Sequence, residues 1–155
     1  MRISLNNLQQ NDEQKRGERV DLHQSTTISV IIPAYNEEKT IGAVISDTAE
    51  ILNGLYVPYE IIVVNDGSTD KTGFVASTHK VTVISNKVNR GKGYSLRRAL
   101  QHAQGDIVVT LDSDGEHNPK EIPDLIEPLH SGADIVAGSR FLGGKTQVTT
   151  KLNEI

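Results

Sequence analysis

The acidic segment Thr110–Pro119, with the sequence TLDSDGEHNP, is the first candidate for chemistry. Asp112 and Asp114 are two residues apart and follow a run rich in Val and Ile, so in extended backbone both carboxylates point to the same side. Two adjacent carboxylates need a cation or a proton between them. Mg²⁺ or Mn²⁺ suits such oxygen ligands and often shares them with substrate phosphates. Glu116 or His117 could add a further ligand or a water contact.

A helix start is the structural alternative for this segment. Asn118 is a good N-cap, Pro119 suits the first helical position, and Glu121 has capping-box spacing. This interpretation accounts for the end of the segment. It leaves Asp112 and Asp114 unexplained, because both lie outside the cap.

The segment Val63–Thr72, VVNDGSTDKT, offers a second carboxylate at the end of an apolar run. Asp66 and Gly67 favour a turn, and Ser68 or Asp70 could cap a following helix. The carboxylate of Asp66 could also accept a hydrogen bond from the N–H of a nucleobase. The sequence alone leaves both interpretations open.

The segment Pro33–Glu38, PAYNEE, allows a similar pair of interpretations. Asn36 could cap a helix, with Glu37 and Glu38 favourable in its first turn. Tyr35 has a flat apolar ring on which a nucleobase could stack.

The segment Asn89–Ser95, NRGKGYS, places Arg90 and Lys92 at the start of a predicted helix. Cations there oppose the helix macrodipole by a few tenths to about 1 kcal/mol, and Gly91 and Gly93 weaken the helix further. These choices are easier to understand if an anion such as a phosphate binds there, which makes Lys92 a candidate ligand-binding residue. A solvated basic turn is the alternative.

The elements that must position these residues follow from hydrophobic periodicity. Short runs of continuous apolarity predict strands covered on both faces. They are ISVII (28–32), EIIVV (60–64), VTVIS (81–85), DIVVTL (106–111) and DIVAG (134–138). Helical stripes with i, i+3, i+4, i+7 spacing occupy 41–52, 96–103 and 122–129.

Alternating strands and helices predict an α/β fold with a mostly parallel sheet. Ligands of such sheets bind beyond the carboxyl ends of the strands, so the four polar segments above should meet at one edge. Arg140 follows the last predicted strand and should project toward the same edge, where it could pair with the acids or with a phosphate. Residues 1–25 are polar and predicted to form a flexible tail.

Composition narrows the class of protein. The chain has 155 residues, a formal net charge of −4 and no cysteine. The acidic balance argues against a nucleic-acid partner, and the lack of cysteine excludes disulfides and cysteine-ligated zinc. No apolar run approaches the roughly 18 residues of a membrane span, and the polar N-terminus does not look like a secretory signal, so we expect a cytoplasmic protein.

The segments together are more specific than any one of them. SVIIPAYNEEKTI, EIIVVNDGSTDKT, NRGKGYSLRRAL, GDIVVTLDSDGEHNP and DIVAGSR, in this order and spacing, resemble a family 2 glycosyltransferase. The resemblance covers about residues 26–142 and is greatest to the dolichyl- and polyprenyl-phosphate sugar synthases of that family. It implies a GT-A fold, which is a Rossmann-like three-layer α/β sandwich that holds a nucleotide-sugar.

The resemblance also implies where the nucleoside lies. Pro33, Tyr35 and Glu37 are expected around the nucleotide, with Val64 and Asp66 near the base. The donor would be a GDP- or UDP-sugar.

For the diphosphate, Asp112 and Asp114 match the DxD motif of the family, which binds Mg²⁺ or Mn²⁺, and are the candidate catalytic residues. Ser113 is expected beside the sugar-nucleotide, and Glu116 stands where the subgroup often has Gln, as a possible metal contact. Arg140 matches an arginine that reaches the phosphates.

The expected function is a metal-dependent, inverting transfer of a sugar from a nucleotide-sugar to an acceptor, a polyprenyl phosphate in the first place and a saccharide otherwise. Peripheral association with the inner face of the membrane would suit a lipid acceptor. Only about 130 residues remain outside the tail, fewer than this family's domain usually has, so residues 143–155 are expected to be a C-terminal tail or a truncated acceptor region. The alternative is a non-catalytic nucleotide-sugar-binding module that lacks the acceptor half, with an exposed sheet edge through which it could form oligomers.

Overall fold

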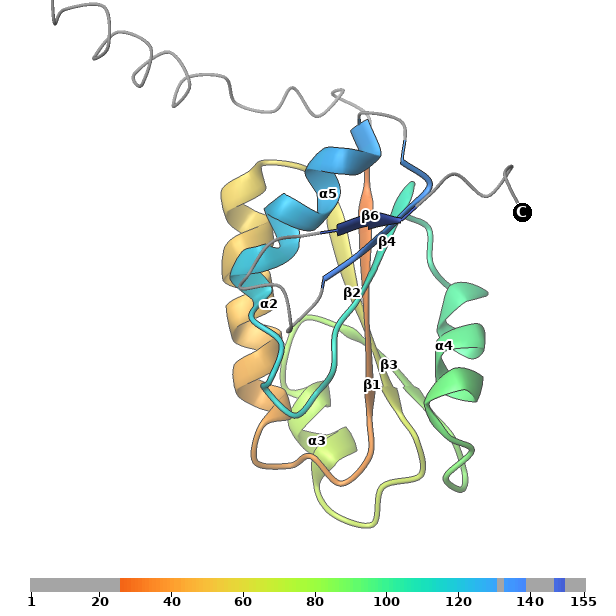
Figure 1. Cartoon of the computed structure of the whole chain (residues 1–155). Coiled ribbons are helices and arrows are strands. Elements are labelled where there is room, and N and C mark those ends of the chain that lie inside the picture. The colour runs from red at the N-terminus through yellow and green to blue at the C-terminus, as the bar shows by residue number, and fades with distance from the viewer. Residues whose placement is uncertain (1–25, 131–132, 139–146, 150–155) are drawn as a thin grey trace, which may run out of the picture.

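The computed structural model of the chain describes residues 26–130, 133–138 and 147–149. Within these ranges, four parallel strands form a sheet in the order β3-β2-β1-β4. They are β1 (Ile28–Ala34), β2 (Tyr59–Asn65), β3 (Thr82–Ser85) and β4 (Ile107–Thr110). The connecting helices are α2 (Ile41–Leu55), α3 (Thr72–Ser77) and α4 (Lys92–Leu100). The predicted alternation of strand and helix is therefore confirmed (Figure 1).

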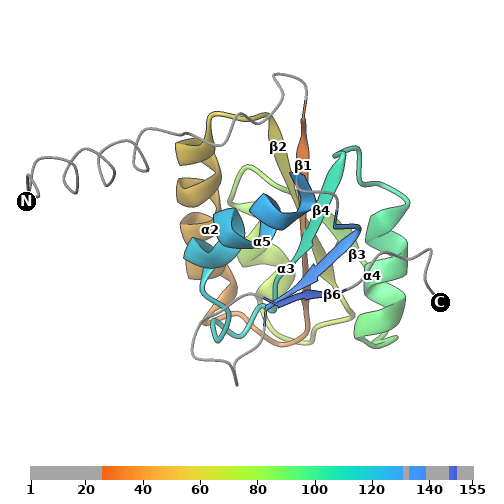
Figure 2. The same ribbon diagram turned by 45° about the horizontal axis from the view of Figure 1, so that its top comes forward.

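The sheet is covered on both faces, which explains why its strands are apolar without alternation. On one face Ile28, Val30 and Ile32 of β1 pack in a cluster with side chains from α2 and from α5 (Ile122–His130). On the other face Ile31 packs with residues of β2, β3 and α4. Figures 1 and 2 show α2 and α5 on one side of the sheet and α4 on the other. The predicted three-layer α/β sandwich is confirmed.

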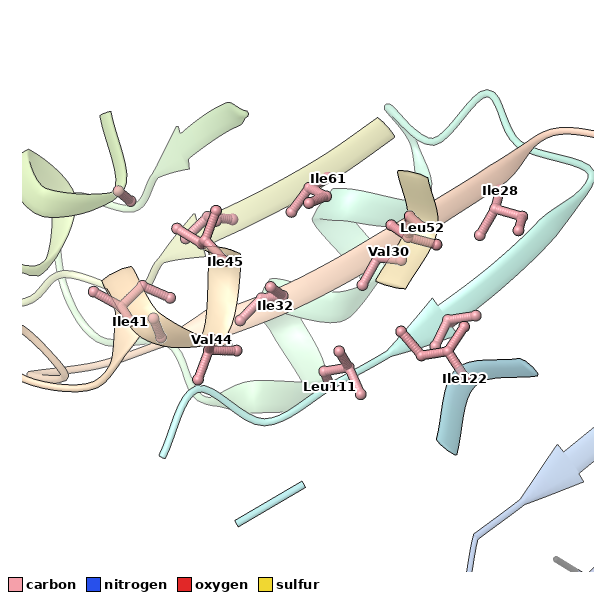
Figure 3. Packing of buried hydrophobic residues seen from close by; sticks show 14 of the residues in the cluster. Ile28, Val30, Ile32, Ile41, Val44, Ile45, Leu52, Ile61, Leu111 and Ile122 are labelled. Atoms are coloured by element: carbon pink, nitrogen blue, oxygen red, sulfur yellow. The ribbon is translucent and has the colours of Figure 1, made fainter. Parts of the chain in front are cut away.

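Helix α2 is fixed by its apolar stripe. Its buried residues are those that the spacing predicted: Ile41, Val44, Ile45, Thr48 and Leu52. Figure 3 shows four of these side chains over β1. Full burial of an aliphatic side chain contributes about 1.5–3 kcal/mol, so the stripe holds α2 firmly against the sheet.

The predicted capping of this helix by Asn36 is wrong. The helix begins at Ile41, and its N-cap residue is Thr40, whose side chain makes no capping hydrogen bond. Asn36 lies well before the helix, at a φ of 56°. Its amide is used by a neighbouring loop, as described below.

The chain after β4 departs from the parallel pattern. A short 3-10 helix, η1 (Pro119–Glu121), leads directly into α5, and Asn118 caps η1 as predicted by accepting a hydrogen bond from the backbone N–H of Lys120. The prediction that the fifth apolar run joins the parallel sheet is wrong, because β5 (Ile135–Ala137) pairs antiparallel with β6 (Gln147–Thr149). Apolar composition predicts a strand but does not choose its partner. Strand β6 lies in the segment that was expected to be a tail or a truncated acceptor region.

Strand β4 forms one edge of the four-stranded sheet. A groove of about 1190 Å³ runs between β4, α5 and β5, and its walls include Leu125, Leu129 and Val136. Glu116 and His117 also line this groove, so it adjoins the acidic segment. Among the described residues, no helix combines the length and the apolar character needed to cross a membrane.

Candidate functional site

Two loops at the carboxyl ends of β1 and β2 are joined by reciprocal hydrogen bonds. The backbone N–H of Asn36 donates to Ser68 Oγ over 3.0 Å, and the Thr69 N–H donates to Asn36 Oδ1 over 2.8 Å. The positive φ of Asn36 belongs to this arrangement, since asparagine tolerates the left-handed region better than most residues. The amide thus bridges two loops.

Glutamate and aspartate side chains continue the bridge. The Glu38 N–H donates to Asp70 Oδ2 over 3.1 Å, while Glu38 Oε2 accepts from the Lys71 N–H over 3.0 Å. Asp70 also accepts from the N–H of Thr72 over 2.9 Å, but the N-cap residue of α3 is Lys71, so the prediction that Ser68 or Asp70 caps this helix is wrong. Partial desolvation raises the pKa of Asp70, but the hydrogen bonds from Thr72 and Glu38 outweigh it and hold that pKa below its ordinary value. The two loops therefore form one hydrogen-bonded unit.

The residues expected around the nucleoside lie in or beside this unit. Val64 is fully buried, and Pro33 is buried opposite it in the β1–β2 ladder. Both side chains are therefore part of the packed interior around the sheet. Tyr35 is 45% exposed and its ring is accessible for stacking. Glu37 is half-buried, and its Oε2 accepts from the hydroxyl of Thr40 over 2.7 Å.

Asp66 is the most deeply held carboxylate of the candidate site, with only 3% of the residue exposed. Its Oδ1 accepts from Asn86 Nδ2 over 2.6 Å and from the Arg90 N–H over 2.9 Å, and its Oδ2 accepts from the Gly91 N–H over 2.7 Å. Burial raises the pKa of Asp66, but these hydrogen bonds outweigh it and leave the pKa below its ordinary value. Ser95 Oγ contacts the same Asn86 amide over 3.2 Å.

In this structure Asp66 therefore anchors the loop between β3 and α4. A carboxylate has about four lone-pair sites. The Asn86 amide and the N–H groups of Arg90 and Gly91 use three of them, and the Ser95 hydroxyl is a further partner of this carboxylate. The role of Asp66 near a base stays a prediction. Asn86, which sequence reasoning did not single out, is the side chain that joins Asp66 to Ser95.

The anchored loop places two cations at the rim of the sheet. Helix α4 begins at Lys92, directly after Gly91, whose φ is 86°. The Arg90 guanidinium carbon lies 4.5 Å from the centre of the Tyr94 ring, a cation–π arrangement. Lys92 points elsewhere, and its Nζ forms an ion pair with Asp112 Oδ1. The prediction that the segments after β3 and β4 meet at one edge is confirmed by this pair.

The acidic segment itself turns sharply after β4. Ser113 is buried, whereas Asp114 and Glu116 are exposed. The Glu116 N–H donates to Asp114 Oδ1 over 2.9 Å, and Gly115 between them has a φ of 80°. Asp114 is thus held in a tight turn that its own side chain helps to close.

The His117 side chain contacts the start of the same acidic segment. Its Nδ1 accepts the backbone N–H of Asp112 over 3.1 Å, so the unprotonated nitrogen faces the main chain and the proton of the neutral ring resides on Nε2. The same Nδ1 lies 3.7 Å from Asp112 Oδ2, but a nitrogen that accepts a hydrogen bond does not donate one to the carboxylate. The main-chain bond is the shorter and fixes the ring.

A metal ion at this site would need oxygen ligands from a bound diphosphate in addition to those of the protein. In the part of the chain that the structure describes, no three His, Asp or Glu side chains are grouped closely enough to hold a metal ion together. The donors are nevertheless suitable, since Asp112 and Asp114 supply hard oxygens and Asp112 already pairs with a positive charge. Magnesium commonly binds through one or two carboxylates plus substrate phosphates, which fits such a pair. The assignment of Asp112, Asp114 and Glu116 as metal ligands stays a prediction, and Arg140 lies outside the described residues.

Comparison with known proteins gives a consistent result. The model of the family described as "Glycosyl transferase family 2" matches residues 29–155. The chain is 40% identical over 125 residues to a dolichol-phosphate mannosyltransferase of Pyrococcus furiosus, covering 77% of this chain and 35% of that protein. It is 36% identical over 120 residues to an undecaprenyl-phosphate 4-deoxy-4-formamido-L-arabinose transferase of Pectobacterium carotovorum, covering 73% of this chain and 36% of that protein.

Two solved structures are also similar to the chain. The glucosyl-3-phosphoglycerate synthase of Mycobacterium tuberculosis, in complex with Mn²⁺, UDP-glucose and phosphoglyceric acid, superposes with a TM-score of 0.60 at 41% identity, covering 69% of this chain and 40% of that one. The mannosyl-3-phosphoglycerate synthase of Rubrobacter xylanophilus gives a TM-score of 0.61 at 28% identity, covering 67% of this chain and 36% of that one. The chain spans about a third of the length of the curated relatives that it matches. On the match of the family model, which covers most of its residues, the chain belongs to glycosyl transferase family 2.

Proposed function

We propose that the chain is the donor-binding part of a metal-dependent, inverting glycosyltransferase that moves a sugar from a nucleotide-sugar to a polyprenyl phosphate. The observation that carries the proposal is the meeting of Lys92 and Asp112 at the carboxyl rim of the sheet, beside the loop held by Asp66. Carboxylates and cations side by side at this rim are what a metal-bound diphosphate requires.

The donor is a GDP- or UDP-sugar. Tyr35 supplies an accessible ring for the base, and we assign Asp66, which follows β2 directly, to a position near the base. We assign Pro33 and Glu37 to the surroundings of the nucleotide and Val64 to the vicinity of the base. Support for a nucleotide-sugar comes from the mycobacterial relative, whose structure is named as a complex with UDP-glucose.

The diphosphate lies at the acidic segment. Asp112 and Asp114 would hold Mg²⁺ or Mn²⁺, with Glu116 as a further contact and Ser113 beside the sugar. When bound, the ion stabilises the negative charge that grows on the leaving nucleoside diphosphate. Lys92 and Arg140 are the cations that we assign to the phosphates.

The acceptor is assigned from chemistry and from the names of the relatives. A lipid phosphate oxygen is already an anion, so it can attack the anomeric carbon with little help from a base. Attack from the face opposite the leaving group inverts the anomeric configuration. Two relatives are named for dolichol-phosphate and undecaprenyl-phosphate acceptors. A lipid acceptor would bring the chain to the inner face of the membrane as a peripheral protein, and a saccharide is the second acceptor class.

The alternative is a module that binds nucleotide-sugars without transferring the sugar. It is favoured by one observation, which is that the chain spans about a third of the length of its curated relatives. Acceptor contacts could then come from a segment outside this chain.

A transfer assay separates the two functions. Radiolabelled GDP-mannose and UDP-glucose would be incubated with the chain, Mn²⁺ and a polyprenyl phosphate in detergent, and the lipid fraction would be counted. Metal-dependent label in the lipid supports the transferase. Calorimetric binding of the nucleotide without any label in lipid or saccharide supports the binding module, and absence of binding contradicts both.

A further inference from the structure

Lys92 and Asp112 form an ion pair between two segments that are 20 residues apart in the sequence. The Lys92 side chain is 57% exposed and the Asp112 side chain is 29% exposed, so the lysine is the more accessible partner. Exposed ion pairs contribute little to stability, and such a pair can be separated at low cost. The pair is therefore suited to exchange partners when a ligand arrives.

The position of Lys92 also argues against a purely local role. It is the first residue of α4, where a positive charge opposes the helix macrodipole. Gly91 before it provides no side-chain cap, and its N–H is already bonded to Asp66. Within the described contacts of Lys92, the favourable partner is the Asp112 carboxylate on another loop.

Around Lys92, the chain's own groups already engage both aspartates. Asp112 pairs with Lys92, and Asp114 accepts the N–H of Glu116 over 2.9 Å. A divalent ion that binds Asp112 alone must compete with the ammonium group for the same oxygen. If a diphosphate arrives as well, the ammonium group gains a new anionic partner while Asp112 becomes available.

We propose that Lys92 is the resident counter-cation of Asp112 and couples the binding of the divalent ion to that of the nucleoside diphosphate. This role rests on the proposed function and deepens it. Lys92 lowers the affinity of Asp112 for the ion alone and raises the affinity for the ion and the diphosphate together. The site consequently fills with both ligands rather than with the ion first, which avoids a metal-loaded site without substrate.

The test measures Mn²⁺ binding from the electron paramagnetic resonance signal of free Mn²⁺, without any assay of transfer. Wild type, Lys92→Gln and Lys92→Arg would be titrated with Mn²⁺ alone and with saturating GDP or UDP, after subtraction of Mn²⁺ bound by the nucleotide in buffer. Lys80→Gln is the matched control, since this exposed lysine precedes β3 and so lies at the amino ends of the strands, opposite the carboxyl rim.

We expect Lys92→Gln to bind Mn²⁺ alone about three- to five-fold more tightly, the upper part of the range that corresponds to an exposed ion pair. In the same variant, the gain in Mn²⁺ affinity caused by the nucleotide should fall by about ten-fold or more. Lys92→Arg should keep most of this gain, and Lys80→Gln should match wild type. Unchanged or weaker Mn²⁺ binding by Lys92→Gln, or an unchanged gain, would overturn the coupling role while leaving the proposed function intact. Failure of wild type to bind Mn²⁺ with either nucleotide would overturn both.

Discussion

Replacing Asp66 with asparagine tests whether this carboxylate holds the rim of the sheet together. Three donors converge on Asp66 at 2.6–2.9 Å, and the residue is only 3% exposed. Asparagine keeps the shape but presents an NH₂ group to at least one of these donors. One charge-assisted hydrogen bond is lost, and if the NH₂ group faces the Gly91 N–H, that N–H keeps Asn89 Oδ1 as its acceptor at 3.0 Å.

The expected cost can be worked from these contacts. A hydrogen bond to a charged group contributes about 1.5–3 kcal/mol and one between neutral groups about 0.5–1.5 kcal/mol, so the two hydrogen bonds that remain are weakened as well. Removing the negative charge also removes its desolvation cost, so we expect Asp66→Asn to lower the free energy of unfolding by about 3 kcal/mol. With an m-value of about 2 kcal/mol/M, the urea midpoint should fall by about 1.5 M.

Urea unfolding followed by far-UV circular dichroism suits this chain, which has no tryptophan. Asp47→Asn is the matched control, because Asp47 is exposed on α2 and its replacement should stay within about 0.5 kcal/mol of wild type. If Asp66→Asn were as stable as Asp47→Asn at the same m-value, the anchoring role of Asp66 would be refuted.

Two further predictions concern stability. Among the residues that the structure describes, three carboxylates have a pKa below the ordinary value of 3.8: Asp66, Asp70 and Asp106. The stability that these ionised carboxylates contribute should be complete above pH 3.8 and should be lost as the pH falls through their lower pKa values in the folded state. The urea midpoint should therefore stay constant from pH 7 to 5 and drop below pH 3.8. A constant midpoint down to pH 2.5 would contradict this prediction. Gly67→Ala should lower the melting temperature sharply, because a Cβ would lie 2.4 Å from the backbone of Val88 at a φ of +70°, whereas Gly54→Ala, in open space on α2, should raise stability by about 0.5–1 kcal/mol. Equal melting temperatures for the two variants would contradict this prediction, because they would show that the loop at Gly67 accommodates a Cβ atom at little cost.

Much of the fold could be predicted from local pattern. The four strands of the parallel sheet and the buried stripe of α2 follow from continuous apolar runs and from 3.6-residue spacing, which are properties of the chain itself. The partner of β5 could not be predicted, since pairing depends on which edge is reached in space. The three-layer arrangement was expected from the family resemblance, whereas periodicity alone predicted an α/β fold with a mostly parallel sheet.

For the candidate site, the sequence predicted which segments lie close together better than it predicted the contacts between their side chains. The topology of a parallel sheet places the segments after β1, β2, β3 and β4 at one rim, and the contact of Lys92 with Asp112 bears this out. The role of Asn36 was mistaken because a side-chain amide satisfies a loop N–H as readily as a helix N–H. Asn86 gave no signal, since an asparagine after a strand is also an ordinary turn residue.

The central claim is that Asp112 and Asp114 join a divalent ion to the diphosphate of a nucleotide-sugar. Its most direct test is a thermal-shift titration of wild type and Asp114→Ala with GDP- and UDP-sugars, with and without Mn²⁺. A ligand at about 100 times its Kd stabilises the folded state by about 2.7 kcal/mol, which corresponds to several degrees in Tm. We predict that Mn²⁺ increases the nucleotide-dependent shift in wild type and has no such effect in Asp114→Ala. An equal response to Mn²⁺ in both proteins would contradict the account.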